Sequence, residues 1–258
     1  MSLFFISDLH LHPSRPEITQ AFYDFLSSIA REAEALYILG DFFEAWLGDD
    51  DDTPMYREVI QRLKDYSLGS GKKNKEQTEN DQPIPVYIMH GNRDFLLGNT
   101  FANQANITLL NDPSVIEYHE CSYLLMHGDS LCTKDADYMA FRAMTRTVEW
   151  QQKVLSSSLQ ERREYAKSLR QKSQEMTSLK AADILDVTPE EVTKKMTEYN
   201  VTNFIHGHTH RPNIHSTTVN NKAARRIVLG DWEHQGWYVE INRTSLSLES
   251  FNIPLKHG

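Results

Sequence analysis

Side chains of the kinds that bind metal ions recur along this chain at points where a short apolar run ends. The seven candidate ligands are Asp8, His10, Asp41, Asn92, His127, His208 and His210. Seven nitrogen and oxygen ligands are too many for one tetrahedral ion and suit two ions that share a bridging carboxylate. We expect Asp41 to be the bridge, because it is the only carboxylate at the end of the second apolar run.

The ligand types indicate both the metal and the chemistry. A set without thiolate favours Mn²⁺, Fe²⁺, Zn²⁺ or Mg²⁺ over copper or iron–sulfur centres, and the amide oxygen of Asn92 suits a hard ion, so we expect two Mn²⁺ ions. Two ions about 3.5–4 Å apart can activate a water at neutral pH and hold the oxygens of a phosphoryl group. Asp94 and Asp129 are expected to orient backbone or ligand histidines instead of binding an ion.

The elements that must position these ligands are six apolar runs. They span residues 3–6, 36–39, 86–89, 123–126, 204–205 and 227–229. Continuous apolar runs are typical of strands that are buried on both faces. Because the first runs alternate with helical patterns over 17–35 and 54–64, we predict an α/β fold. Ligands at the carboxyl ends of such strands should converge on one rim of the sheet.

The second half of the chain departs from this alternation. Helical patterns take over between Thr133 and Asn200, which predicts a helical insertion, or cap, at about 134–200 within a single domain of 1–258. Thr188, Pro189 and Glu191 predict a capping box at the start of its last helix. A hairpin turn is expected at Asn220–Asn221. The polar segment 67–82 is expected to be a surface loop, without an assigned function.

The charge is unevenly distributed. A net charge of −9 over 258 residues argues against a nucleic-acid partner. Residues 142–172 nevertheless hold eight basic side chains against three acidic ones, a local charge of +5. The apolar residues between them could face a membrane or acyl chains, or else pack on the core beneath a solvated face; they are Met144, Trp150, Val154, Leu155 and Leu159. The acidic run 49–52 is expected to be a solvated turn.

Composition limits the cellular setting. Hydrophobic content of 40% and charged content of 24% are those of an ordinary globular protein. Cys121 and Cys132 make no disulfide framework and fit a reducing compartment. We see no signal peptide and no run of the ~20 apolar residues that cross a membrane. We therefore expect a cytoplasmic protein, or one on the cytoplasmic side of a membrane, without an obligate protein partner.

The ligands fall into five sequence blocks. Asp8-x-His10, Gly40–Asp41, Gly91–Asn92, His127 and Gly207–His208–Thr209–His210 resemble the signature of calcineurin-like metallophosphoesterases. The resemblance implies a two-sheet β-sandwich flanked by helices, with a dinuclear site at the sheet edge. It also implies that one ion is held by Asp8, His10, Asp41 and His210, and the other by Asp41, Asn92, His127 and His208.

Arg93 departs from the usual pattern of the superfamily. Members that act on phosphomonoesters usually carry His after this Asn, as a general acid for an alkoxide leaving group. A guanidinium cannot donate a proton at neutral pH, but it can clamp a phosphate through two hydrogen bonds. A leaving group that needs no proton is a phosphate, whose second ionisation lies near a pKa of about 6. Arg93 therefore predicts cleavage of a pyrophosphate.

Longer runs over 36–50, 90–98, 126–133 and 205–212 resemble the branch of this family that hydrolyses UDP-2,3-diacylglucosamine in Gram-negative lipid A synthesis. The resemblance implies attack of water on the α-phosphate, which gives UMP and 2,3-diacylglucosamine 1-phosphate, and peripheral association with the inner membrane. Catalytic roles carry over to Asp41, Asn92, Arg93 and His208. Substrate contacts carry over to Asn92, Arg93, Asp135, Ser173, Thr177, Lys180 and His208, although Thr177 stands where Asn is expected.

Two other functions are compatible with this fold and are weighed against the sequence. A soluble nucleotide pyrophosphatase or phosphodiesterase of the same superfamily would use the same metal blocks, but the apolar, basic insertion argues against a soluble substrate. A scaffold that binds proteins through this fold would be expected to lack ligands, and here all seven are present.

Overall fold

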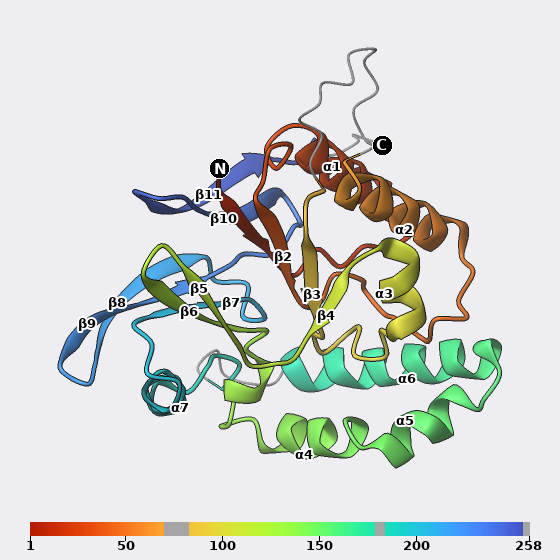
Figure 1. Ribbon diagram of the computed structural model, residues 1–258. Coiled ribbons are helices and arrows are strands. Elements are labelled where there is room, and N and C mark those ends of the chain that lie inside the picture. The colour runs from red at the N-terminus through yellow and green to blue at the C-terminus, as the bar shows by residue number, and fades with distance from the viewer. Residues whose placement is uncertain (70–82, 179–183, 255–258) are drawn as a thin grey trace, which may run out of the picture.

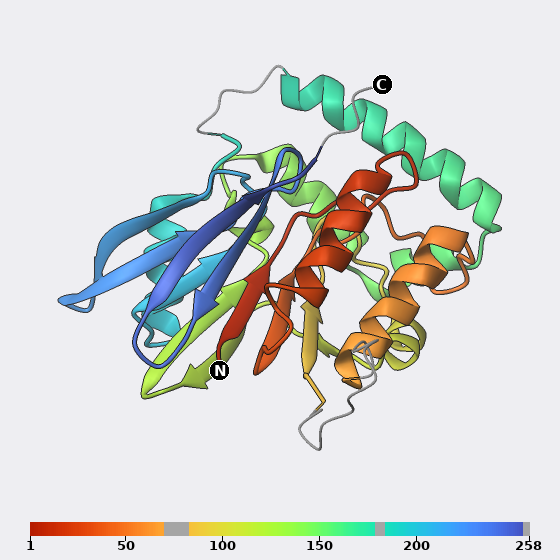
Figure 2. The ribbon, with the colours of Figure 1, turned by 90° about the horizontal axis from the view of Figure 1, so that it is seen from above.

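Two mixed β-sheets stack against each other in this protein (Figures 1 and 2). The computed structural model describes residues 1–69, 83–178 and 184–254, without the side chains of 172–178. The first sheet has the order β11-β10-β1-β2-β3-β4, with β1 (Leu3–Ile6), β2 (Ala35–Leu39), β3 (Val86–Met89), β4 (Thr108–Leu110), β10 (Gln235–Ile241) and β11 (Leu246–Asn252). The second has the order β5-β6-β7-β9-β8, with β5 (Ser114–Tyr118), β6 (Cys121–Met126), β7 (Asn203–His206), β8 (Asn213–Val219) and β9 (Lys222–Val228).

The six apolar runs form the parallel centres of these sheets. Strands β1, β2 and β3 run parallel in the first sheet, and β6, β7 and β9 run parallel in the second. The expectation that the runs belong to a single sheet was therefore wrong, because they divide between two sheets. The α/β class and the two-sheet sandwich with flanking helices are confirmed.

Alternate residues of the central strands face different layers of the core. Phe4 and Ile6 pack in the cluster that joins the first sheet to its helices. Leu3 and Phe5 pack in a second cluster, between the two sheets, with Ile205 of β7. Because both faces of β1 are buried in this way, its sequence is apolar throughout instead of alternating.

Helices cover both outer faces and one end of the sandwich. The helices are α1 (Pro16–Ser27), α2 (Pro54–Ser67), α3 (Asn99–Ala105), α4 (Ala136–Thr145), α5 (Val148–Leu155), α6 (Leu159–Ser178) and α7 (Pro189–Glu198), with a short 3₁₀ turn at Asp129–Leu131. The first three pack on the first sheet, and α7 packs on the second. Helices α4, α5 and α6 lie beyond the carboxyl ends of β1, β2 and β3 (Figure 1). None of the described helices has the length and apolar character needed to cross a membrane.

Three local predictions have clear outcomes. The first helix ends at Ser27, well before residue 35, where β2 begins. The last helix of the predicted insertion begins at Pro189 as expected, but the Thr188 hydroxyl accepts from the Thr133 hydroxyl at 2.8 Å and does not cap, so the capping box was wrong. The turn at Asn220–Asn221 is confirmed, and both residues have the positive φ that a tight hairpin requires (50° and 60°).

The boundaries of the insertion, about 134–200, stay a prediction. Helices α4 to α6 lie over the strand ends, whereas α7 belongs by its packing to the second sheet. The segment predicted as a polar loop lies largely outside the described residues, at 70–82.

Candidate active site

The ends of parallel strands from both sheets meet at one edge of the sandwich, and the seven candidate ligands come from these ends. Asp8 and His10 follow β1, Asp41 follows β2 and Asn92 follows β3. His127 follows β6, while His208 and His210 follow β7. Hydrogen bonds join the segments of one sheet to those of the other, from His208 N–H to Asp8 Oδ2 and from His127 Nδ1 to the Leu39 carbonyl. The edge is thus one continuous surface built by both sheets.

The backbone at this edge is unusual. Five of the seven candidate ligands adopt the left-handed conformation, with φ between 49° and 67°; they are Asp8, His10, Asp41, His208 and His210. This conformation is uncommon for residues other than glycine and costs free energy. Such conformations cluster at functional sites because the surrounding structure has to impose them. The conformation turns the chain sharply after the strand.

Glycines within the sequence blocks allow the segments to approach closely. A Cβ atom on Gly91 would lie 2.1 Å from Oδ1 of Asp41, and one on Gly207 would lie 2.2 Å from Oδ2 of Asp8. No side chain could be accommodated at these distances without displacing a candidate ligand. The glycines of the motifs are therefore required by packing against the carboxylates.

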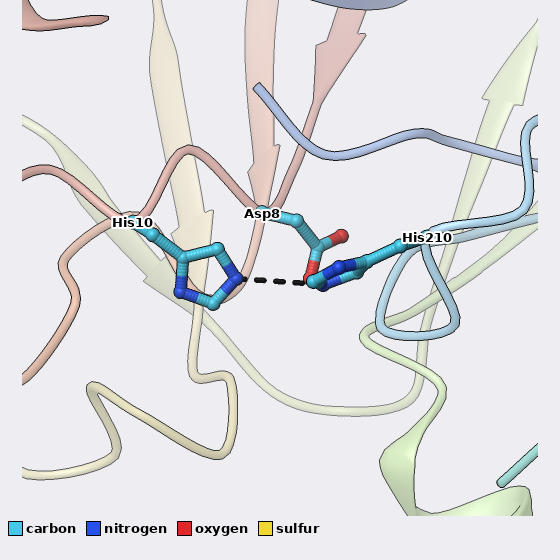
Figure 3. A group of neighbouring side chains, drawn as sticks. All are labelled: Asp8, His10 and His210. Carbon is cyan, nitrogen blue, oxygen red and sulfur yellow. Dashed lines mark hydrogen bonds and ion pairs between the residues drawn. The ribbon is translucent and has the colours of Figure 1, made fainter. Parts of the chain in front are cut away.

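One group of ligand atoms comprises Asp8, His10 and His210. Figure 3 shows the two imidazole rings approaching from opposite sides, with the Asp8 carboxylate between them. His210 Nε2 lies 3.3 Å from Asp8 Oδ1 and 3.4 Å from His10 Nε2. The other oxygen, Oδ2, accepts from Ser7 and from His208 N–H, whereas Oδ1 is buried and makes no well-formed hydrogen bond to any described residue. A buried carboxylate oxygen of this kind fits a bound cation, which would offset its desolvation.

A second group surrounds the side-chain oxygen of Asn92. His127 Nε2 lies 3.0 Å from Asn92 Oδ1, and His208 Nδ1 lies 2.8 Å from the same atom. His127 Nδ1 donates to the Leu39 carbonyl at 2.9 Å, which leaves Nε2 as the nitrogen facing the site. The three side chains converge as ligands of one ion would.

Asp41 stands between the two groups. Its Oδ1 lies 3.7 Å from His127 Nε2, and its Oδ2 lies 3.9 Å from His10 Nε2. The Arg93 backbone N–H donates to Oδ1 at 2.8 Å and fixes the carboxylate. Asp41 could therefore contribute to both groups of ligands if two ions were bound. Donor atoms within 4.8 Å of one another include the sets Asp8–His10–His210 and Asp8–Asp41–His127.

Comparison with known proteins shows the family to which this chain belongs. Residues 1–212 match the family described as calcineurin-like phosphoesterase. The chain belongs to this family. It is 49% identical to a protein of Cellvibrio japonicus named UDP-2,3-diacylglucosamine hydrolase, over 98% of this chain and 100% of the relative. It is also 49% identical to the protein of the same name from Pseudomonas aeruginosa PAO1, over 94% of this chain and 95% of the relative.

Solved structures add little. A structure titled as a novel archaeal phosphodiesterase covers 97% of this chain and 100% of its own, with 12% identity and a TM-score of 0.47, which is too low to bear on function.

The surroundings of the phosphoesterase site raise the pKa of two of its histidines and lower the pKa of a third. Burial disfavours a charged His127, but the carboxylates of Asp41 and Asp8 outweigh this effect and raise its pKa to about 9. Burial also opposes the charge on His210, but the adjacent carboxylate of Asp8 outweighs this effect and raises the pKa of His210 to about 9. His208 has its pKa lowered to about 4 by burial and by the charge of His127.

These shifts predict that metal binding releases protons. His127 and His210 hold their protons at pH 7 in the metal-free protein, and a metal ion binds only the neutral imidazole. We expect calorimetric titration with Mn²⁺ at pH 7, in buffers of different ionisation enthalpy, to report release of about two protons. The affinity should rise with pH up to about 9, and the release should disappear above that pH. A binding enthalpy independent of the buffer at pH 7 would contradict the prediction.

Asp94 and Asp129 differ in their hydrogen-bond partners. Asp94 is buried and accepts at 2.8 Å from the backbone N–H groups of Phe42 and Gly91, so it orients the segments that carry Asp41 and Asn92. Asp129 instead accepts from the Tyr138 hydroxyl and, at 2.8 Å, from Arg142 Nε. It thus links the His127 segment to α4, and among the described residues it accepts no hydrogen bond from a ligand histidine.

The expectation of a solvated turn at the acidic run 49–52 is correct only in part, because Asp50 and Asp52 are exposed but Asp51 is buried. Asp49 accepts from the N–H groups of Gly98 and Phe101 at the start of α3. Asp50 pairs with Arg162, and the buried Asp51 pairs with Arg163 at 3.0 Å. The run anchors α3 and α6 because its partners arrive from distant parts of the chain.

Much of the positive charge of 142–172 points toward the sandwich. Five arginines contact groups there: Arg142 and Arg146 contact Asp129, Arg162 and Arg163 contact the acidic run, and Arg170 contacts Glu44. The apolar residues divide between two environments. Trp150 and Val154 line a cavity, whereas Met144 and Leu155 are exposed.

This cavity of about 740 Å³ lies between α4–α6 and the strand ends. Three of the predicted substrate contacts line it, namely Asn92, Arg93 and Asp135. Asp135 also caps α4 by accepting from Tyr138 N–H at 3.0 Å. His208 lies in the ligand group around Asn92. Ser173 and Thr177 belong to α6, where side chains are not described, and Lys180 lies outside the described residues.

Glu44 is a residue of the site that the sequence analysis did not identify. Its carboxylate is buried, and Oε2 lies 3.3 Å from His10 Nδ1. Burial raises its pKa, but His10, Arg93 and Arg170 outweigh this effect and lower the pKa to about 2. An acidic residue directly after the apolar pair Phe42–Phe43, three positions beyond a ligand, was the available signal.

Proposed function

We propose that this phosphoesterase hydrolyses the pyrophosphate bond of UDP-2,3-diacylglucosamine in lipid A synthesis. Water attacks the α-phosphate, which releases UMP and 2,3-diacylglucosamine 1-phosphate. The observation that carries the proposal is an arginine, not a histidine, directly after Asn92, at a cavity with an apolar lining. The names of the relatives at 49% identity support the same substrate.

The proposed cofactor is a pair of divalent ions, with Mn²⁺ preferred and Mg²⁺, Fe²⁺ or Zn²⁺ as alternatives. The seven ligands are assigned as two sets that share Asp41, and the buried Oδ1 of Asp8 supports a cation at the first set. When bound, two such ions supply an activated water and charge stabilisation at the phosphoryl oxygens.

We assign to Arg93 the role of binding the leaving phosphate. Its side chain is half-buried and lines the cavity, and Nε is buried without a hydrogen-bond partner among the described residues. An unpartnered buried guanidinium nitrogen is ready to bind an anion. The group that leaves the α-phosphate is 2,3-diacylglucosamine 1-phosphate, a phosphate that needs no proton, so a permanent cation serves this reaction without a general acid.

The cavity supports a lipid over a soluble nucleotide. Its apolar lining includes Trp46, Phe95, Phe141, Trp150, Val154 and Leu169. A volume of about 740 Å³ is in the range of cavities that enclose a drug-sized ligand or part of a larger one. We assign this lining to the acyl chains, because a soluble dinucleotide has no apolar group of that size to bury.

The proposal also places the enzyme at the cytoplasmic side of the inner membrane, as a peripheral protein. Of the described large hydrophobic residues that are exposed, four belong to α4–α6 or the turn between them: Met144, Val148, Leu155 and Tyr165. Such side chains beside the cavity are suited to contact with lipid, where the substrate resides.

The test compares the hydrolysis of two substrates by one enzyme sample whose metal content has been measured. We expect UDP-2,3-diacylglucosamine to be hydrolysed with a kcat/KM at least about 10³-fold above that of a UDP-sugar without acyl chains, since burial contributes ~0.8 kcal/mol for each methylene. Trp150→Ala should reduce turnover of the lipid and leave that of the acyl-free compound unchanged. Equal turnover of both substrates would instead favour a soluble nucleotide pyrophosphatase.

A further inference from the structure

We infer that Glu44 is a positioning residue for His10, and that Arg170 of α6 holds Glu44 in place. The inference rests on the proposed metal site, because it treats His10 as a ligand. It assigns to Glu44 no contact with substrate or ions.

The contacts of Glu44 form a chain from α6 to His10. Oε2 lies 3.3 Å from His10 Nδ1, and the Arg15 guanidinium lies 3.5 Å from the same oxygen. Arg15 also donates to the His10 backbone carbonyl at 2.8 Å. The second oxygen, Oε1, pairs with Arg170. The buried carboxylate is therefore held by a cation on each oxygen, and His10 is held at both its ring and its backbone.

The orientation of the His10 ring indicates what the contact with Glu44 does. Its Nε2 faces Asp41 and His210, while Nδ1 on the opposite side of the ring faces Glu44. Nδ1 and Glu44 Oε2 lie within ion-pair distance without the geometry of a well-formed hydrogen bond. A carboxylate beside Nδ1 favours the tautomer with its proton on that nitrogen, which leaves Nε2 unprotonated and a stronger ligand. His10 also has a left-handed backbone, with φ of 50°, so its geometry has to be imposed by neighbouring groups.

Arg170 adds a link between the helices and the metal edge. It lies on α6, more than 120 residues beyond Glu44 in the chain, and lines the cavity that is assigned to the substrate. Through Glu44, the docking of α6 acts on the orientation of a ligand histidine. The expected consequence is that loosening α6 at this point weakens metal binding even when no substrate is present.

The test is calorimetric titration of the metal-free full-length protein with Mn²⁺ in the absence of substrate. We expect wild type to show two sites. Glu44→Ala should weaken one of them by about 10- to 100-fold, the range typical for loss of such a partner. Glu44→Gln should have a smaller effect, because it keeps an acceptor for Nδ1. Arg170→Gln should weaken the same site a few-fold, and Arg170→Lys should restore it.

A double mutant and a matched control separate positioning from general stability. If Arg170 acts through Glu44, adding Arg170→Gln to Glu44→Gln should cause no further loss of affinity, whereas additive losses would refute the link. Arg163→Gln breaks another ion pair of α6, with Asp51, and should leave the metal affinity unchanged. Thermal unfolding of each metal-free variant reports on folding.

The inference and the proposed function can fail separately. Unchanged Mn²⁺ affinity in both Glu44 variants would overturn the inference, whatever the substrate. Weakened affinity in these variants would support it even if wild type failed to hydrolyse UDP-2,3-diacylglucosamine.

Discussion

Asp41→Asn is expected to lower activity by at least about 10³-fold, because it removes the charge shared by both ions. The two oxygens of Asp41 face His127 on one side and His10 on the other, so both groups of ligands lose the carboxylate. The amide has nearly the same shape as the carboxylate and can still accept from Arg93 N–H, so the fold should be retained. Hydrolysis of the lipid substrate and metal content on the same sample provide the measurement.

His10→Ala is the comparison for this prediction. It removes a ligand from one group only, and the ion there keeps its other ligands, so we expect a milder loss than for Asp41→Asn. Near-normal activity of Asp41→Asn with both metals bound would be incompatible with the dinuclear assignment.

Arg93→Ala is expected to reduce the rate of pyrophosphate hydrolysis by about 10²- to 10³-fold, as for other groups that stabilise charge in a transition state. Arg93→Lys should recover only part of this loss, since a point charge cannot reproduce the two parallel hydrogen bonds of a guanidinium. The alkaline limb of the wild-type rate profile should show no ionisation that belongs to this position. Steady-state kinetics over a range of pH provide the measurement.

Arg93→His tests the leaving-group argument from the other direction. This variant should lose pyrophosphate cleavage and gain slow hydrolysis of esters with alkoxide leaving groups, which a histidine can protonate. Unchanged turnover of the pyrophosphate in Arg93→Ala would show that Arg93 is a structural cation, and the choice of substrate class would lose its main physical support.

The ligand set is the part of this protein that its sequence determines most directly. Asp, His and Asn bind hard or borderline ions because of their own chemistry, and that property needs no knowledge of the fold. The apolar runs before them report burial on both faces, since only strands enclosed on both sides lack polar alternation. The same local logic identified Arg93, whose inability to donate a proton is intrinsic to the guanidinium.

The division of these runs between two sheets could not be obtained in this way. The runs of β1 and of β6 are equally apolar, and nothing in their composition distinguishes a partner in the same sheet from one in the facing sheet. Strand pairing is decided by packing across the whole domain. The left-handed backbone of residues such as Asp8 and Asp41 is likewise imposed by the surrounding segments, because isolated chains avoid that conformation.

Tertiary structure also decided the roles of the buried acids. Within the sequence, Asp51 looks like part of a solvated turn, and its role appears only when the fold brings Arg163 to it across 112 residues of chain. Glu44 has no visible role until His10 and Arg170 meet at its carboxylate. The physical reason is common to both: a charged side chain in a low-dielectric interior is defined by its partner, and the fold alone brings that partner near.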